Sequence, residues 1–159
     1  MSMLPRNEPG FFELERRRQS GARVVFTNGC FDLLHVGHLR YLREAAALGD
    51  TLIVGINSDR SVTQLKGPSR PVVTEEERAE LLSALEPVDI VLIFDEETPE
   101  QLIRAVRPNV LVKGGDWPVD RIVGADFVLA SGGVVRSLPY VPGRSTTGLL
   151  RRIGEREEE

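Results

Sequence analysis

The chain has 159 residues, 41% of them hydrophobic and 28% charged, which is typical of one globular domain with a proper core. Its formal net charge of −4 comes mostly from the acidic tail at residues 155–159, and no clustered basic face points to nucleic-acid binding. One cysteine excludes an internal disulfide, the N-terminus has no hydrophobic signal region, and no apolar run approaches the ~20 residues of a membrane span, so we expect a cytoplasmic protein.

Apolar runs and helical periodicities alternate through the first half of the chain. Val36, Leu39, Leu42 and Ala46 recur at helical spacing, and Gly49 follows as a C-cap. The predicted elements are a helix over 11–20, a strand over 23–28, a helix over 36–48, a strand over 51–56 and, after a polar loop at 66–71, a helix over 74–85 that opens with a capping box.

The second half continues the alternation. Thr98-Pro99-Glu100 is a typical helix start, and that helix must end before Pro108. Residues 119–133 are ambiguous, and we expect a helical turn followed by an extended piece. The remaining predicted elements are strands over 88–94, 110–113 and 134–138, and a last helix that Ser145 caps and that runs to about 153.

Strands that alternate with helices predict an α/β fold: a Rossmann-like, three-layer αβα arrangement around a five-stranded, mostly parallel sheet. We expect right-handed crossovers between the strands. No internal repeat and no linker divides the chain, so we expect a single domain over residues 1–154, with disorder at 1–9 and 155–159.

Polar, glycine-rich and cationic residues follow the predicted strands at the end where parallel α/β sheets bind ligands. The first strand leads into residues 28–32 and then the histidines, and the second leads into 57–59. The fourth leads into Lys113-Gly114-Gly115-Asp116, and the fifth leads into 143–147. This convergence at one edge of the sheet predicts a site for an anionic ligand.

The two histidines of the chain, His35 and His38, are three residues apart with Gly37 between them, at the start of a predicted helix. At this spacing the two side chains share one face of the helix. The helix N-terminus offers free N–H groups and a positive dipole end, which suit the phosphates of a nucleotide. A plain surface pair and a zinc site are the alternatives; zinc needs three or four protein ligands, and no third ligand of obvious spacing follows.

The segment Asn28-Gly29-Cys30-Phe31-Asp32-Leu33-Leu34-His35-Val36-Gly37-His38, with its HxGH core, resembles the signature of the cytidylyltransferase-like nucleotidyltransferases. Ser145-Thr146-Thr147, at a late helix start, matches the second signature of that family. The runs 112–117 and 27–32 are closer to one branch, the heptose 1-phosphate adenylyltransferases of ADP-heptose synthesis, which are often fused to a heptose kinase. The resemblance covers about residues 10–153, and these elements in this order are highly specific.

The resemblance implies roles for individual residues. His35 and His38 contact the triphosphate in the transition state, and Gly37 allows its close approach. The helix dipole disfavours a histidine cation here and a triphosphate favours it, so protonation is expected to be linked to nucleotide binding. The implied catalytic residues are His35, His38 and Lys113; the implied nucleotide-binding residues are Asn28, Gly29, Cys30, Phe31, Asp32, Gly37, Lys66, Arg78, Gly114, Ser145, Thr146 and Thr147; and the implied substrate-binding residues are Asp116, Trp117, Arg70 and Arg144.

Several of these residues have an ordinary structural alternative. Lys66 has the alternative of a solvated loop lysine, Arg78 that of a helix-surface ion pair with Glu75, and Ser145 that of an N-cap alone. Trp117 is equally a packing residue.

Lys113 is harder to explain by packing, because it ends a buried strand and precedes two glycines. The N–H groups of such a glycine turn can form an anion-binding nest. Asp32 has two possible roles, which are to orient the loop or to orient the histidines.

The implied reaction transfers AMP from ATP to D-glycero-D-manno-heptose 1-phosphate and releases pyrophosphate. Chemistry on a triphosphate implies Mg²⁺, held mainly through the phosphates, since no carboxylate cage is visible in the sequence and no protein metal ligand is assigned. A separate heptose kinase is the implied functional partner, and the family implies a homodimer.

The choice of nucleotide base depends on departures from the glycerol-phosphate cytidylyltransferase pattern. Tyr140, Val141 and Pro142 stand where that pattern has arginine, threonine and glutamate, and Gly115 stands where it has aspartate. These differences favour adenine. The open alternatives are a cytidylyltransferase acting on glycerol 3-phosphate, an FMN adenylyltransferase, and a nucleotide-binding regulatory module without catalysis.

Overall fold

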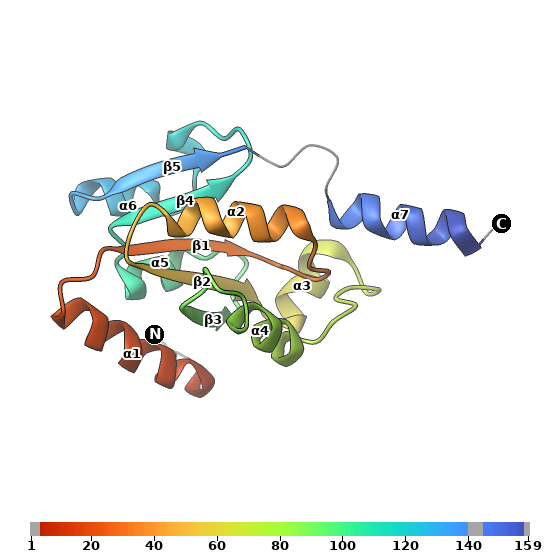
Figure 1. The fold of residues 1–159 in the computed structure, drawn as a ribbon, viewed down its shortest axis with the longest axis horizontal. Helices are drawn as coiled ribbons and strands as arrows, with labels where there is room; N and C mark the ends of the chain where they lie inside the picture. The colour runs from red at the N-terminus through yellow and green to blue at the C-terminus, as the bar shows by residue number, and fades with distance from the viewer. Residues whose placement is uncertain (1–3, 140–144, 158–159) are drawn as a thin grey trace.

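The fold is a five-stranded parallel sheet with the strand order β3-β2-β1-β4-β5, covered by helices on both faces (Figure 1). The computed structural model describes residues 4–139 and 145–157. The strands are β1 (Val24–Gly29), β2 (Thr51–Asn57), β3 (Ile90–Phe94), β4 (Val110–Gly114) and β5 (Val134–Leu138). The predicted three-layer α/β architecture is confirmed, and every strand pair is parallel.

Helices occupy the connections between the strands and both ends of the described chain. They are η1 (Pro5–Asn7), α1 (Glu8–Gln19), α2 (Val36–Ala46), α3 (Asp59–Lys66), α4 (Glu75–Ser83), α5 (Glu100–Val106), η2 (Val119–Arg121), α6 (Ala125–Ala130) and α7 (Thr146–Glu157). None of them, in the part of the chain that the structure describes, is long and apolar enough to cross a membrane.

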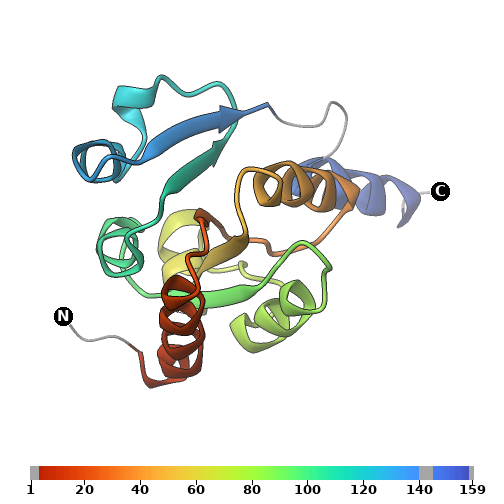
Figure 2. The ribbon, with the colours of Figure 1, turned by 60° about the vertical axis from the view of Figure 1, so that its left-hand side comes forward.

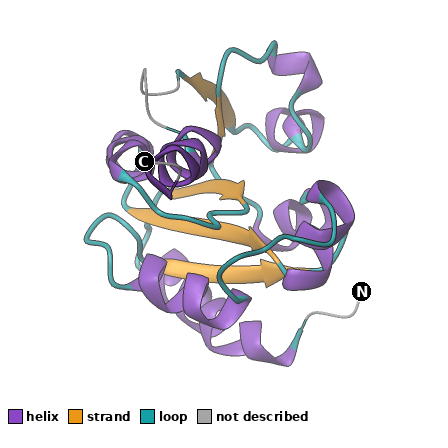
Figure 3. Ribbon diagram, turned by 90° about the vertical axis from the view of Figure 1, so that its right-hand side faces the viewer, coloured by secondary structure: helices purple, strands orange, loops and turns teal. Residues whose placement is uncertain are grey.

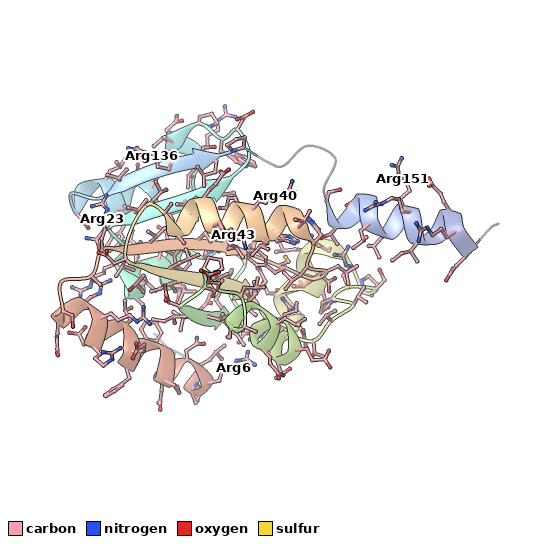
Figure 4. The ribbon with its side chains drawn as sticks, in the orientation of Figure 1. Arg6, Arg23, Arg40, Arg43, Arg136 and Arg151 are labelled. Carbon is pink, nitrogen blue, oxygen red and sulfur yellow. The ribbon has the colours of Figure 1, made fainter. Side chains whose placement is uncertain are left out.

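The sheet separates two apolar cores, because successive residues of a strand point to opposite faces. On one face, Phe26 packs with side chains of α1, α5 and α6. On the other face, Val25 packs with Leu42 of α2 and Leu82 of α4. Figure 2 shows α1 and α2 on opposite sides of the sheet. Arg40 and Arg43 lie on the exposed surface of α2, away from Leu42 (Figure 4).

The direction of the strand order reverses at β1, and the pairing on its two sides differs in length. The ladder between β1 and β2 runs over six positions, from Val24 with Thr51 to Gly29 with Ile56. The ladder between β1 and β4 covers only Val25 and Phe26. The carboxyl-terminal half of β1 therefore has no ladder partner in β4, which leaves room for a ligand at the topological switch point.

The N-terminal segment departs from the expectation of disorder over 1–9, because residues 5–9 are helical. Asn7 is buried beside the edge strand β3, where its side-chain amide donates to Ile93 O (2.7 Å) and its carbonyl oxygen accepts from Ile93 N (2.9 Å). A lone asparagine in a polar segment gives no sequence signal for such a pairing. Residues 1–3 lie outside the described residues.

Two helices were missing from the sequence-based prediction. Helix α3 occupies the polar stretch before the loop at 66–71; Ser58 caps it, and Val62 is its one fully buried apolar side chain. Helix α6 replaces the predicted extended piece and begins after Gly124, whose positive φ of 83° suits glycine. Both helices are too short for a clear periodicity.

The last helix is longer than predicted. Helix α7 continues through residues 155–157, which we expected to be disordered, while 158–159 lie outside the described residues. It has no buried residue, and its local support includes an i,i+4 ion pair between Arg151 and Glu155. Figure 1 shows α7 extending beyond the sheet, and Figure 3 shows this end of the molecule facing the viewer.

Candidate active site

A cavity of about 680 Å³ lies at the carboxyl ends of the strands around the switch point. It brings together residues from the ends of all strands but the last, and from the start of α7. Its lining is Asn28, Gly29, Cys30, Phe31, Asp32, His35, Gly37, His38, Tyr41, Asn57, Leu65, Lys66, Arg70, Phe94, Glu97, Thr98, Pro99, Lys113, Gly114, Val123, Ser145, Thr146 and Thr147. Most of the site residues predicted from the sequence therefore meet in one place.

The loop from β1 to α2 turns sharply beneath the histidines. Phe31 has a φ of +49°, a left-handed conformation that is uncommon for a non-glycine residue. A side chain at Gly29 would come within 2.9 Å of the Phe31 ring, so the turn requires glycine there. The Phe31 ring in turn lies 5.2 Å from the His38 ring, centroid to centroid. The buried phenyl ring thus supports one wall of the histidine pair.

His35 and His38 cap the start of α2 with their own rings. His35 Nδ1 accepts a hydrogen bond from Gly37 N (3.1 Å), and His38 Nδ1 accepts one from His35 N (3.2 Å). A neutral imidazole that accepts at Nδ1 carries its proton on Nε2. The backbone therefore selects the tautomer in which both rings have an Nε2–H donor.

The environment of His38 keeps this ring neutral. Burial, followed by the positive potentials of His35 and Lys66, lowers the pKa of His38 to about 4. At neutral pH the ring is then an uncharged donor, and an added anion nearby would favour its cation.

Asp32 holds the loop that carries Arg70. Its buried carboxylate accepts from Arg70 Nε (2.6 Å), from Val72 N (2.9 and 3.0 Å) and from Val73 N (2.9 Å). Burial raises the pKa of Asp32, but the hydrogen bonds from Val73, Val72 and Arg70 together hold it below its usual value. Of the two expected roles, orientation of a loop is the one that these contacts support, and the loop is that at 70–73.

Arg78 lies behind the cavity rather than in its wall. Its guanidinium is buried and donates to the carbonyl oxygens of Val73 (2.9 Å), Cys30 (2.7 Å) and Asn57 (2.8 Å). It forms its ion pair with Asp59 (2.9 Å), not with the expected Glu75. Arg78 thus fastens the ends of β1 and β2 to α4, which is a supporting position rather than the predicted nucleotide contact.

Glu75, the partner that we expected for Arg78, pairs instead with Arg6 in the N-terminal segment. Figure 4 shows Arg6 beside α4. This ion pair adds to the contacts that hold the segment in place.

The end of β4 brings Lys113 and Gly114 to the cavity, whereas Asp116 and Trp117, in the turn that follows, lie outside its lining. Trp117 is 46% exposed, so it is not a packing residue of the core. The N–H of Gly115 donates to Leu138 O (2.7 Å). That N–H is therefore used by the fold and is not a free donor of the expected anion-binding nest.

The start of α7 closes one side of the cavity. Ser145 Oγ accepts from Gly148 N (2.9 Å), as expected of an N-cap, and Thr146 Oγ1 donates to Leu33 O (3.3 Å) in the β1–α2 loop. Thr147 also lines the cavity. Arg144, expected to bind the substrate, lies outside the described residues.

The sequence-based prediction missed part of the cavity wall. The β3–α5 loop contributes Glu97, Thr98 and Pro99, and Tyr41 reaches the wall from α2 with its hydroxyl 2.6 Å from Thr27 Oγ1. Glu97, Thr98 and Pro99 follow the end of β3, so they could have been predicted from the strand ends, as the other loops were. No group of three or more His, Cys, Asp or Glu side chains within residues 4–139 and 145–157 is arranged to hold a metal ion.

Comparison with known proteins gives consistent similarities. The family model described as cytidylyltransferase-like matches residues 26–133. The bifunctional protein HldE of Syntrophotalea carbinolica is 55% identical over 147 residues, which are 92% of this chain and 30% of that protein. The protein of the same name from Methylobacillus flagellatus is 54% identical over 136 residues, which are 86% of this chain and 28% of that protein.

A solved structure is also similar. The lipopolysaccharide core biosynthesis protein of Thermoplasma volcanium superposes with a TM-score of 0.60 at 29% identity, over 76% of this chain and 98% of that one. The chain spans less than a third of the length of the curated relatives named above.

Proposed function

Because the chain belongs to the cytidylyltransferase-like family of nucleotidyltransferases, we propose that it transfers AMP from ATP to a sugar 1-phosphate. The proposed acceptor is D-glycero-D-manno-heptose 1-phosphate, and the products are an ADP-sugar and pyrophosphate. One observation carries the proposal: two imidazoles with Nε2–H donors line the same cavity as Lys66, Lys113 and the hydroxyls of 145–147.

The proposed reaction needs little covalent chemistry from the protein. A phosphate oxygen of the acceptor attacks the α-phosphorus of ATP in line, a new P–O bond forms, and the bond to pyrophosphate breaks. The attacking oxygen is already anionic at neutral pH, so no general base is required. The protein's contribution is to position both phosphates and to stabilise the charge on the phosphoryl oxygens and on the leaving group.

In this proposal the donors of the cavity act on the phosphates. His35 and His38 donate from Nε2 to the oxygens whose charge grows in the transition state, and the helix N-terminus adds its dipole. Lys66 and Lys113, from the ends of α3 and β4, neutralise the polyphosphate. A cavity of about 680 Å³ is within the usual range of ~300–1,000 Å³ for small-molecule sites.

The carboxylates in the described part of the cavity lining indicate how Mg²⁺ would be held. Asp32 is already engaged by Arg70 and two backbone N–H groups, which leaves Glu97 as the other carboxylate in the described lining. This fits an ion that binds mainly through nucleotide phosphates and keeps several waters. When bound, Mg²⁺ would neutralise phosphate charge.

The experiment is a panel of ATP and CTP against heptose 1-phosphate, glycerol 3-phosphate and FMN, each with Mg²⁺, with pyrophosphate release as the readout. We expect release from ATP only with the heptose 1-phosphate. Turnover of CTP with glycerol 3-phosphate, or of ATP with FMN, would replace the proposed substrates. Tight ATP binding without turnover of any acceptor would support a regulatory module instead. A kinase must supply the sugar 1-phosphate.

A further inference from the structure

Lys113, at the end of β4, has a single directed partner among the residues that the structure describes. Its Nζ lies 5.6 Å from the centroid of the Trp117 ring, within the range of a cation–π interaction. Within residues 4–139 and 145–157 the ammonium of Lys113 makes no side-chain hydrogen bond and no ion pair. Lys113 lines the cavity and Trp117 does not, so the ring reaches the cavity only through the lysine.

The backbone that carries the Trp117 ring is hydrogen-bonded to β5. Trp117 N donates to Gly115 O (3.1 Å) and to Ser137 Oγ (3.2 Å), and the Ser137 hydroxyl donates to Gly115 O. Gly115 has a φ of +96°, and its N–H bonds to Leu138 O, so the turn requires glycine and is tied at both ends. The ring therefore projects from a fixed turn.

A fixed aromatic face next to a flexible lysine has a physical consequence. The lysine side chain has four rotatable bonds and loses much conformational freedom when it is immobilised on a phosphate. An aromatic face attracts the ammonium and restricts it before any ligand binds. Less freedom then remains to be lost on binding.

We propose that Trp117 is a positioning residue for Lys113: its ring holds the ammonium at the cavity wall, in place to meet an anionic phosphate oxygen. The inference rests on the proposed phosphate chemistry of the cavity, but not on which nucleotide or acceptor is used. It replaces the expected direct contact of Trp117 with substrate.

The first test is a double-mutant cycle with W117L, K113M and the double variant, read as kcat and KM for each substrate and as the Kd of ATP by calorimetry. We expect W117L to lower kcat/KM and to weaken ATP binding by about two- to fivefold, the size of an exposed cation–π contact. W117F, which keeps an aromatic face, should recover most of the loss. F12L, a similar change at an exposed ring on α1, is the matched control and should change neither quantity.

The cycle separates the proposal from its rivals. In the K113M background, W117L should have no further effect on kcat/KM or on the Kd of ATP. An equal loss in both backgrounds would overturn the proposal, because Trp117 would then contact the ligand directly or act through the fold. No loss in W117L would overturn it as well. If K113M turns over too slowly to measure, the Kd of ATP alone decides the cycle.

The second test does not depend on turnover. Trp117 is the only tryptophan in the chain, so emission excited where the two tyrosines do not absorb reports its surroundings alone. We expect K113M to change the emission of the ligand-free protein, and inorganic pyrophosphate to change it in the wild type but not in K113M. Identical spectra for the ligand-free proteins would overturn the inference. Altered emission together with no turnover of any acceptor would reject the proposed function and leave the lysine–tryptophan contact standing.

Discussion

The imidazole rings of His35 and His38 stack with their centroids 3.9 Å apart, and each ring uses its Nδ1 to accept a backbone N–H at the start of α2. Two positive charges at this separation repel strongly, and burial adds to the cost of charging His38. In the ligand-free protein the pair therefore offers Nε2–H donors without a double positive charge. A polyphosphate bound in front of the rings favours the protonated, positively charged form instead.

ATP binding near pH 6 is expected to take up protons at His38. The pKa of this ring is about 4 in the free protein, and a bound triphosphate raises it, so the fraction protonated at pH 6 increases on binding. Calorimetry in two buffers of different ionisation enthalpy measures the uptake. The same titration of the H38A variant gives the uptake due to ATP's own phosphates, and subtracting it leaves the uptake at His38. Equal proton uptake in the two proteins would contradict the linkage.

The same pKa predicts how His38 affects stability. The pKa of about 4 in the folded protein lies below the ordinary histidine value of 6.5, so the unfolded chain binds more protons between those two pH values. Stability should therefore fall as the pH drops from 6.5 towards 4. The H38Q variant should show a shallower fall in urea midpoints over this window. A pH dependence as steep as that of the wild type would mean that His38 does not titrate in this way.

Replacing His38 with alanine should lower kcat by ~10²–10³, the usual cost of losing one preorganised donor to developing charge. The effect on ATP affinity should be much smaller, because the donor acts mainly in the transition state. Single-turnover rates and ATP titrations separate the two quantities. Wild-type kcat in H38A would remove this ring from the mechanism.

Replacing Asp32 with asparagine should loosen the loop at 70–73 and leave Arg70 without its counterion. The carboxylate side chain is 1% exposed and that of Arg70 is 16% exposed, so the loss should be about 3 kcal/mol of unfolding free energy. The Asp32 pKa lies below its usual value, so this stabilisation is present above pH ~4 and disappears as the pH falls through the folded pKa. Urea unfolding at pH 7 measures it. A change below ~0.5 kcal/mol would show that the contact is not important for stability.

Replacing Arg78 with alanine distinguishes the supporting position seen here from a direct contact with the nucleotide. The side chain is buried and its removal leaves the Cys30 and Asn57 carbonyls without a donor, so we expect about 3 kcal/mol of lost stability. R151A removes an exposed helix-surface pair and should cost less than ~0.5 kcal/mol. An R78A protein with wild-type thermal stability and no activity would favour the direct contact instead.

The sequence predicted the sheet because its strands are continuous apolar runs, and it predicted the site because polar residues follow those runs at one edge. The features that it did not predict depend on contacts between residues that are far apart in the chain. Asn7 pairs with Ile93, 86 positions away, and no local sequence pattern indicates that pairing. Arg78 looked like a helix-surface residue from its neighbours, but its hydrogen-bond partners include Cys30, 48 positions away.

A crystal structure with ATP or a non-hydrolysable analogue bound is the most direct test of the proposed function. We predict that the triphosphate lies in the cavity, with phosphoryl oxygens within hydrogen-bonding distance of Nε2 of both His35 and His38 and with Lys113 close to the chain of phosphates. A nucleotide whose phosphates bind elsewhere, with the two rings facing only protein or solvent, would contradict it.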